Sequence, residues 1–154
     1  MSDRTALQVI VLSCPLERVR AVLAVLTERS LGEFFGDEDA VVLGEQYLAP
    51  EESFGSAEEL AAELVAAAPE VAFLAWEDPR YKWLGTVFAY VPGVGQFTGP
   101  CDAQGTPLWT TDQVLGLLGP GNMLNADSEM QMGVAVFARI QELLTLGATT
   151  IGPT

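Results

Sequence analysis

The sequence predicts an α+β fold, a sheet with helices packed on one face. Apolar, β-branched runs alternate with segments of helical periodicity in the order β-α-β-α-β-β, followed by a hairpin and two helices. Apolar residues make up 49% of the chain and charged residues only 18%, which is typical of a compact domain rather than a disordered chain. The 154 residues contain no linker or internal repeat, so we expect a single domain over residues 1–154.

The first predicted strand covers residues 6–13, which are apolar and β-branched. The segment "CPLERVRAVLAVLTERSLG" then has the pattern of a helix, with Pro15 suited to its first turn and Gly32 to its end. Four apolar residues recur at helical spacing and predict a buried face: Leu16, Val19, Leu23 and Leu26.

A second strand is predicted over residues 40–49, "AVVLGEQYLA", before another helix. That helix begins at Ser56, which is followed three residues later by Glu59. This spacing is typical of a capping box, in which the hydroxyl and the carboxylate each accept a hydrogen bond from a backbone N–H. The helix is expected to end before Pro69.

Two further strands follow, and the first of them is expected at the centre of the sheet. "EVAFLAW" is apolar on both faces, which favours a central strand. "EDPRYK" predicts a turn, "WLGTVFAYV" a fourth strand and "PGVG" another turn. "QFTGPCDAQGTPLW" then indicates a short hairpin with "DAQG" at its tip.

The last part of the chain predicts two helices and a frayed tail. Thr110 and Gln113 repeat the capping-box spacing at the start of a helix that ends at Gly119. A second helix is expected over residues 127–146, with Gly147 as its stop and "ATTIGPT" as a tail. Its predicted buried stripe consists of Val134, Phe137, Ile140 and Leu144.

Negative charge is concentrated in one part of the chain, whose net charge is −14. Residues 30–79 contain 13 Asp and Glu and no Lys or Arg, whereas the other 104 residues contain 8 acidic and 7 basic residues. Duplex DNA has one negative charge per ~1.7 Å of axis, so 13 carboxylates on one face would match the charge density of a nucleic acid. A field of this sign repels phosphates and therefore disfavours direct binding to DNA or RNA.

These carboxylates are the candidate residues for binding a basic partner protein. An alternative is a solvated acidic face that only keeps the protein in solution. The candidate set within the acidic segment is Asp37, Glu38, Asp39, Glu45, Glu51, Glu52, Glu59, Glu63, Glu77 and Asp78.

No metal, cofactor or membrane anchor is expected. The chain has no histidine and only two cysteines, Cys14 and Cys101, so the common zinc sites are excluded. "GDEDAVVLGEQ" lacks the ligand spacing of a calcium loop, and "PGVG" and "GLLGPG" lack the context of a dinucleotide loop. The absence of a signal-like or long apolar segment favours a cytoplasmic protein with reduced thiols, although a Cys14–Cys101 bridge remains an alternative.

One enzymatic alternative depends on Cys14 and Asp78. Cys14 and Arg20 have the C-x5-R spacing, which resembles the phosphate loop of protein tyrosine phosphatases, and the pair Asp78-Pro79 resembles their general acid. The loop interior "PLERV" departs from that pattern, because it has no glycine and its Glu17 would repel a phosphate.

A second alternative is a homo-oligomeric interaction module. Eight of the 13 aromatic residues fall between residues 73 and 109. Tyr81, Trp83 and Trp109 lie next to predicted turns, where partly exposed aromatic side chains would suit a protein interface.

The segment "EDPRYKWLGTVFAYVPGVG" and its continuation resemble small, acidic, uncharacterised proteins encoded on phages and integrative elements of high-GC actinobacteria. The resemblance covers residues 76–115 best, and "VIVLSCPLERVRAVLAVL" is a second piece of it. It implies a cytoplasmic protein expressed from a mobile element. Genes of that origin often encode inhibitors of host defence, and some such inhibitors imitate nucleic acid.

The sequence therefore favours a non-enzymatic protein that acts by contact with a basic protein surface. In the sharper form of this hypothesis, the chain is an acidic inhibitor that imitates nucleic acid, and its partner is a nucleic-acid-binding defence protein. The alternatives are the phosphatase-like or small-molecule site at Cys14 and Asp78, and the oligomeric module.

Overall fold

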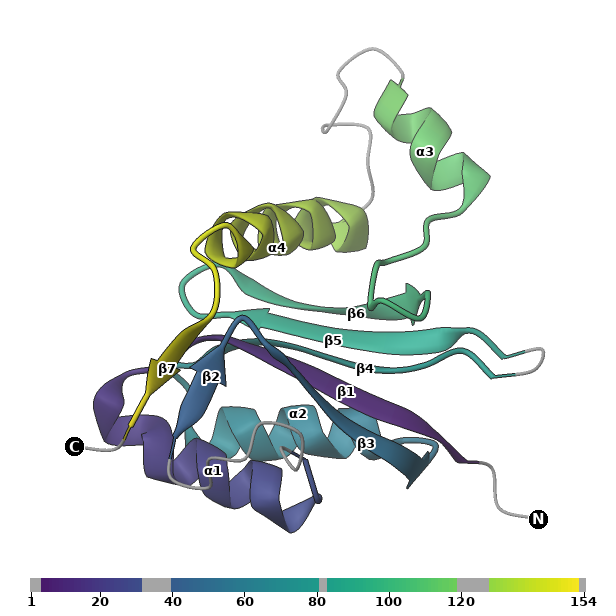
Figure 1. Ribbon diagram of the computed structural model, residues 1–154. Coiled ribbons are helices and arrows are strands. Elements are labelled where there is room, and N and C mark those ends of the chain that lie inside the picture. Colours follow the sequence, from purple (N-terminus) through teal and green to yellow (C-terminus); the bar gives the residue numbers. More distant parts are fainter. Residues whose placement is uncertain (1–3, 32–39, 81–82, 119–127, 153–154) are drawn as a thin grey trace.

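The computed structural model describes residues 4–31, 40–80, 83–118 and 128–152, and within them the predicted α+β class is confirmed (Figure 1). A five-stranded antiparallel sheet has the order β3-β1-β4-β5-β6, and a second sheet pairs β2 with β7. The strands are β1 (Arg4–Ser13), β2 (Val41–Leu43), β3 (Gln46–Ser53), β4 (Ala72–Glu77), β5 (Gly85–Val91), β6 (Gly95–Cys101) and β7 (Thr149–Ile151). The helices are η1 (Leu16–Arg18), α1 (Val19–Glu28), α2 (Ser56–Ala67), α3 (Thr111–Leu118) and α4 (Ser128–Leu144).

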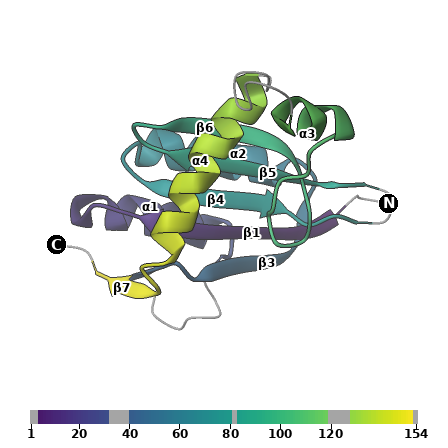
Figure 2. The same cartoon turned by 90° about the horizontal axis from the view of Figure 1, so that it is seen from above.

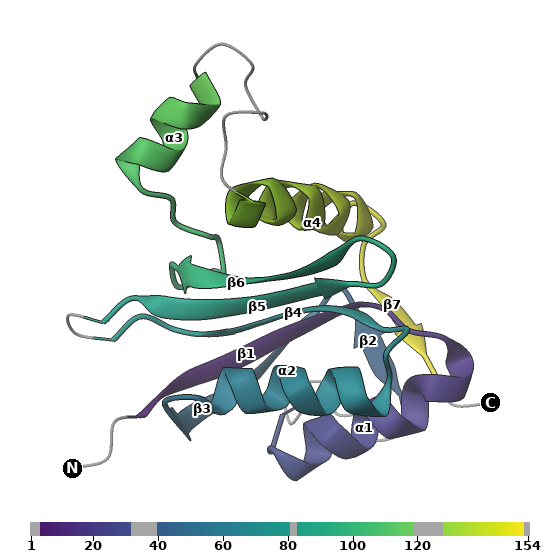
Figure 3. The same cartoon turned by 180° about the vertical axis from the view of Figure 1, so that it is seen from behind.

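Helices cover the main sheet on both faces. The predicted one-sided layer corresponds to α1 and α2, which lie side by side against one face, while α4 crosses the other face over β6, β5 and β1 (Figures 2 and 3). Strand β4 accounts for the helix on the second face, because it is buried along its whole length, as predicted from its continuous apolar sequence. Its side chains alternate between two hydrophobic clusters, one on each face of the sheet.

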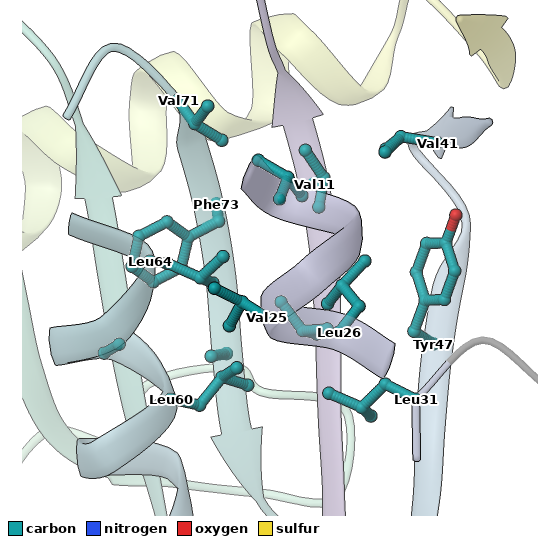
Figure 4. Close-up of a cluster of buried hydrophobic side chains, with 14 of the residues drawn as sticks. Val11, Val25, Leu26, Leu31, Val41, Tyr47, Leu60, Leu64, Val71 and Phe73 are labelled. Atoms are coloured by element: carbon teal, nitrogen blue, oxygen red, sulfur yellow. The ribbon is translucent and has the colours of Figure 1, made fainter. Parts of the chain in front are cut away.

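The larger cluster lies between the sheet and the pair α1 and α2. Figure 4 shows Val25 and Leu26 from α1, Leu60 and Leu64 from α2, and Phe73 from β4 gathered in it. Burying large apolar side chains of this kind contributes about 1.5–3 kcal/mol each. This cluster therefore fixes the position of α2 against β4.

The smaller cluster lies under α4 and corrects the predicted stripe of that helix. Ile140 is buried as predicted, and Phe137 and Leu144 pack against the cluster. Val134 is 37% exposed, however, and Val136 is fully buried in its place. The stripe that faces the sheet therefore consists of Val136, Phe137, Ile140 and Leu144, on a helix that crosses the strands obliquely (Figure 2).

The predicted second strand over residues 40–49 is two strands. Gly44 has a φ of +82°, a left-handed conformation that breaks the extended run. The part after it, β3, pairs with β1 at the edge of the main sheet and continues through Pro50, which lies in a bulge where the β1–β3 register shifts. The part before it, β2, pairs with β7, so the prediction of a frayed C-terminal tail was wrong for residues 149–151.

Several local predictions are confirmed. The backbone N–H of Thr110 donates to Gln113 Oε1 (2.7 Å) and the N–H of Gln113 to Thr110 Oγ1 (3.2 Å), which is the reciprocal pair of a capping box. Asp102 Oδ1 accepts hydrogen bonds from the N–H groups of Gln104 and Thr106 at the tip of the "DAQG" turn. Within the described ranges, no helix has the length and apolar character needed to cross a membrane.

Candidate protein-binding surface

The predicted acidic residues fall into three groups. Asp37, Glu38 and Asp39 lie outside the described residues. Glu45, Glu51 and Glu52 lie on or next to the edge strand β3, and Glu59 and Glu63 lie on α2. Glu77 and Asp78 lie at the end of the central strand β4.

Carboxylates from three elements converge around Arg29, which follows the last turn of α1. The Arg29 guanidinium binds Glu63 through two hydrogen bonds (Nη2–Oε1 2.7 Å and Nε–Oε2 3.1 Å) and Glu59 through one (Nη2–Oε2 3.2 Å). Glu28, Glu52 and Glu63 line a polar hollow of about 230 Å³ together with Arg29. We call Glu28, Glu52, Glu59, Glu63 and Arg29 the Arg29 cluster; its four carboxylates outnumber its single guanidinium.

Arg29 holds this cluster together electrostatically. Its hydrogen bond and its charge keep the pKa of Glu63 below the usual range, so Glu63 stays ionised at neutral pH. The same hydrogen bond raises the pKa of Arg29. The predicted residues Glu52, Glu59 and Glu63 are therefore brought together as a negatively charged surface on α2 and β3.

One further carboxylate of the acidic segment, Glu70, pairs with an arginine elsewhere. Glu70 forms two hydrogen bonds with Arg18 (2.9 and 3.0 Å), and this contact lowers the pKa of Glu70. The clustering of acids in the sequence therefore overstates the charge that any one face presents.

Glu77 is buried and caps helix α2. Only 6% of it is exposed, and its Oε1 accepts hydrogen bonds from the backbone N–H groups of Gly55 (2.7 Å) and Ala57 (2.9 Å). The predicted capping box of Ser56 and Glu59 was wrong, because Ser56 donates its hydroxyl to Ser53 O and Glu59 binds Arg29. The carboxylate of Glu77 supplies the cap instead, from a strand that follows α2 in the sequence.

Asp78 also interacts with the interior. Its Oδ1 accepts hydrogen bonds from Gln8 Nε2 (2.5 Å) and Trp76 Nε1 (3.1 Å). Burial raises the pKa of Asp78, and the two donors partly oppose this effect. Glu77 and Asp78 thus stabilise the fold around the end of β4, and the exposed part of the predicted set is on β3 and α2.

The structure does not bring Cys14 and Asp78 together. The Asp78 N–H donates to Ala6 O near the start of β1, whereas Cys14 follows the opposite end of that strand. Eight residues of strand at ~3.3 Å each separate them by roughly 26 Å. Cys14 and Cys101 are both free thiols.

The Cys14 thiol is also poorly suited to nucleophilic chemistry. Burial, assisted by the charges of Glu17 and Glu70, raises its pKa from the ordinary 9.0 to about 11. Each pKa unit changes the thiolate fraction tenfold, so we expect Cys14 to react with iodoacetamide at pH 7.5 about 100-fold more slowly than an ordinary thiol. Mass spectrometry of the alkylated protein over time measures this rate, and alkylation as fast as that of free cysteine would contradict the prediction.

Aromatic residues of the 73–109 region differ in exposure. Trp76 is buried, Trp109 is half-buried with its ring 5.3 Å from that of Phe97, and Trp83 is 58% exposed. Tyr81 lies outside the described residues. Of the two described residues that were predicted to suit an interface, Trp83 is therefore more exposed than Trp109.

An apolar groove runs between α2 and the strands β5 and β6, with a volume of about 690 Å³. Nothing in the sequence pattern pointed to it, because its walls come from segments that are distant in the chain. Phe88 and Tyr90 alternate with buried residues along β5 and are half-buried, so one face of that strand is only partly covered.

No site for a metal ion emerges from the part of the chain that the structure describes, where no group of three or more Cys, Asp or Glu side chains is arranged for one. Comparison with known proteins gave no match: no family model fits the chain, and no curated protein or solved structure is significantly similar to it.

Proposed function

We propose that this is a non-enzymatic binding protein that docks on a basic surface of a partner protein through the Arg29 cluster. The observation that supports this function most directly is that Glu59 and Glu63 bind the Arg29 guanidinium while Glu28 and Glu52 line a hollow beside it. The remaining negative charge lies on three elements, α1, α2 and β3. Such a surface attracts Lys and Arg side chains and accelerates association with a basic partner.

In the sharper form of this proposal, the partner is a nucleic-acid-binding protein in the cytoplasm, and the carboxylates take the place of phosphates. The net charge of −14 supports it, because the same field repels nucleic acid and attracts proteins that bind nucleic acid. A partner of this kind would bind either duplex DNA or this protein, and not both at once.

We expect the triple variant Glu28→Lys, Glu52→Lys and Glu59→Lys to weaken binding to the partner at least about 30-fold. Glu63 is left unchanged in this variant because it holds Arg29 most closely. Partners captured from a cell lysate at about 0.05 M salt and released at about 0.5 M salt would be purified, and their affinities measured by calorimetry.

A matched control changes the net charge equally at another place. Glu17→Lys, Asp112→Lys and Glu142→Lys lie on η1, α3 and α4. This control should change affinity less than about threefold. Equal weakening by both triple variants would show that total charge, and not the Arg29 cluster, drives binding. If duplex DNA did not compete with this protein for the partner, the nucleic-acid-mimicking form of the proposal would be excluded, but docking on a basic surface would not.

A further inference from the structure

The groove beside α2 has an aromatic floor and a wall of small side chains. Phe73, Phe88 and Tyr90 form the floor, and the rings of Phe73 and Tyr90 are 5.8 Å apart. The wall is the outer flank of α2, formed by Ala61, Ala62, Val65 and Ala66. A second hollow of about 420 Å³ shares Glu58 and Phe88 with the groove and extends it to the exposed side chains of Phe54, Trp83 and Leu84.

The groove lies where a third helix would pack on this face of the sheet. Helices α1 and α2 contact each other, and α2 contacts β4 and β5 (Figure 3). Neighbouring helices lie about 8–10 Å apart, which is about two strand spacings of ~4.8 Å. A helix beside α2 would therefore lie over β5 and β6, and none of the described helices occupies that position, since α4 crosses the opposite face.

The charges around the groove indicate what its occupant should be. Glu58 of α2 and Glu129 in the first turn of α4 both line it. The described residues that line the two hollows include no Lys or Arg. An occupant with apolar side chains facing the floor and Lys or Arg at its sides would complement both the shape and the charge.

We propose that this groove binds an amphipathic, basic helix of a partner protein. The apolar face of that helix packs on Phe88 and Tyr90, and its cationic side chains pair with Glu58 and Glu129. This is the helix-in-groove mode, in which apolar residues at i, i+3, i+4 and i+7 anchor the peptide. The groove lies on the flank of α2 opposite the Arg29 cluster, so it is a site beyond the one proposed above.

A second copy of the protein is a less suitable occupant. Helix α3 stands away from the sheet (Figure 1) and exposes Val114, Leu115 and Leu118. It is eight residues long and contains Asp112 but no Lys or Arg. Its charge would oppose the carboxylates of Glu58 and Glu129.

The experiment uses two synthetic 18-residue helical peptides that share one leucine face. One peptide has lysine on its polar face and the other has glutamate. Titration calorimetry at physiological salt should show the lysine peptide binding with 1:1 stoichiometry and the glutamate peptide binding at least about 100-fold more weakly. Binding of the two peptides with equal affinity, or of neither, would overturn the proposal.

Two alanine variants then locate the site. Ala62 on α2 and Ala24 on α1 are both exposed helical alanines, and arginine is a good helix former at either position. Ala62→Arg should weaken the lysine peptide at least about tenfold, whereas Ala24→Arg, with the same added charge, should change its affinity less than threefold. Far-UV circular dichroism confirms that both variants are folded.

The same variants distinguish binding in the groove from general charge attraction and from self-association. Equal weakening by Ala24→Arg and Ala62→Arg would assign binding to general electrostatics and overturn the proposal. A dimer that dissociates with either Ala62→Arg or Leu118→Glu would assign the groove to a second copy and overturn it too. Ala62→Arg should also weaken the lysine peptide when it is introduced into the triple variant of the Arg29 cluster. This result would support binding in the groove even if the Arg29 cluster binds no partner.

Discussion

Replacing Trp76 with alanine is expected to lower the free energy of unfolding by about 3–5 kcal/mol. The side chain is 1% exposed in the hydrophobic cluster under α4. Its indole N–H donates to both Asp78 Oδ1 and Ala103 O, each at 3.1 Å. The variant would thus leave a large cavity and remove the donor that ties the 102–105 turn to β4.

Gly105 shows how closely that turn packs on the indole. A Cβ atom at Gly105 would lie 2.8 Å from Trp76 Cδ2, and the φ of Gly105 is +76°. The turn is therefore shaped around this one side chain, and little nearby structure is able to fill the space that Trp76→Ala would leave.

Thermal unfolding followed by circular dichroism checks this expectation. A loss of this size should lower the midpoint by roughly 6–20 °C in a domain of about 150 residues. Trp83→Ala is the matched control, since Trp83 is largely exposed and should cost less than about 1 kcal/mol. Equal losses for the two tryptophans would contradict the central role of Trp76.

Replacing Glu77 with alanine is expected to cost about 2–4 kcal/mol. The substitution leaves the N–H groups of Gly55 and Ala57 without their acceptor at the N-terminus of α2, and the Ala57 N–H bond is buried. Hydrogen bonds from buried donors to a charged acceptor contribute more than neutral ones, because an unmatched donor keeps its full desolvation cost.

Urea denaturation at neutral pH measures this loss. Glu77→Gln keeps one acceptor oxygen and should recover part of the stability. Glu51→Ala is the control, because Glu51 is exposed on the edge strand β3 and should cost less than about 1 kcal/mol. A Glu77→Ala protein as stable as Glu51→Ala would show that the cap of α2 does not depend on this carboxylate.

Features that depend on neighbouring residues were predictable from the sequence. The continuous apolar run 71–76 identified the central strand, because only a strand covered on both faces tolerates such a sequence. The pair Thr110 and Gln113 formed its predicted reciprocal bonds because both residues lie at the start of one exposed helix.

Features that depend on distant residues were not predictable in the same way. Ser56 and Glu59 have the same capping-box spacing, yet Glu77 reaches α2 from β4 and Arg29 from the end of α1 binds Glu59. The short strand β7 has three residues and no strong pattern, so only its pairing with β2 identifies it. The groove likewise forms between α2 and strands that follow it in the chain.

The candidate surface was predicted in part, for the same reason. The sequence identified Glu52, Glu59 and Glu63 as acidic and close in the chain, and folding placed them around Arg29. The same count of charges included Glu77, whose carboxylate is used inside the fold. Whether a carboxylate faces water or a helix N-terminus depends on the tertiary arrangement, which a count of charges does not contain.

The pairing of β2 with β7 has a consequence for synthesis. Because about a hundred residues separate the two strands, a ribosome that adds ~5–20 residues per second needs roughly 5–20 s to deliver the second strand after the first has emerged. During that interval the nascent chain exposes a strand edge at residues 41–43 that only its own later residues will cover. Chaperones that recognise unpaired strands would find their target there, early in translation.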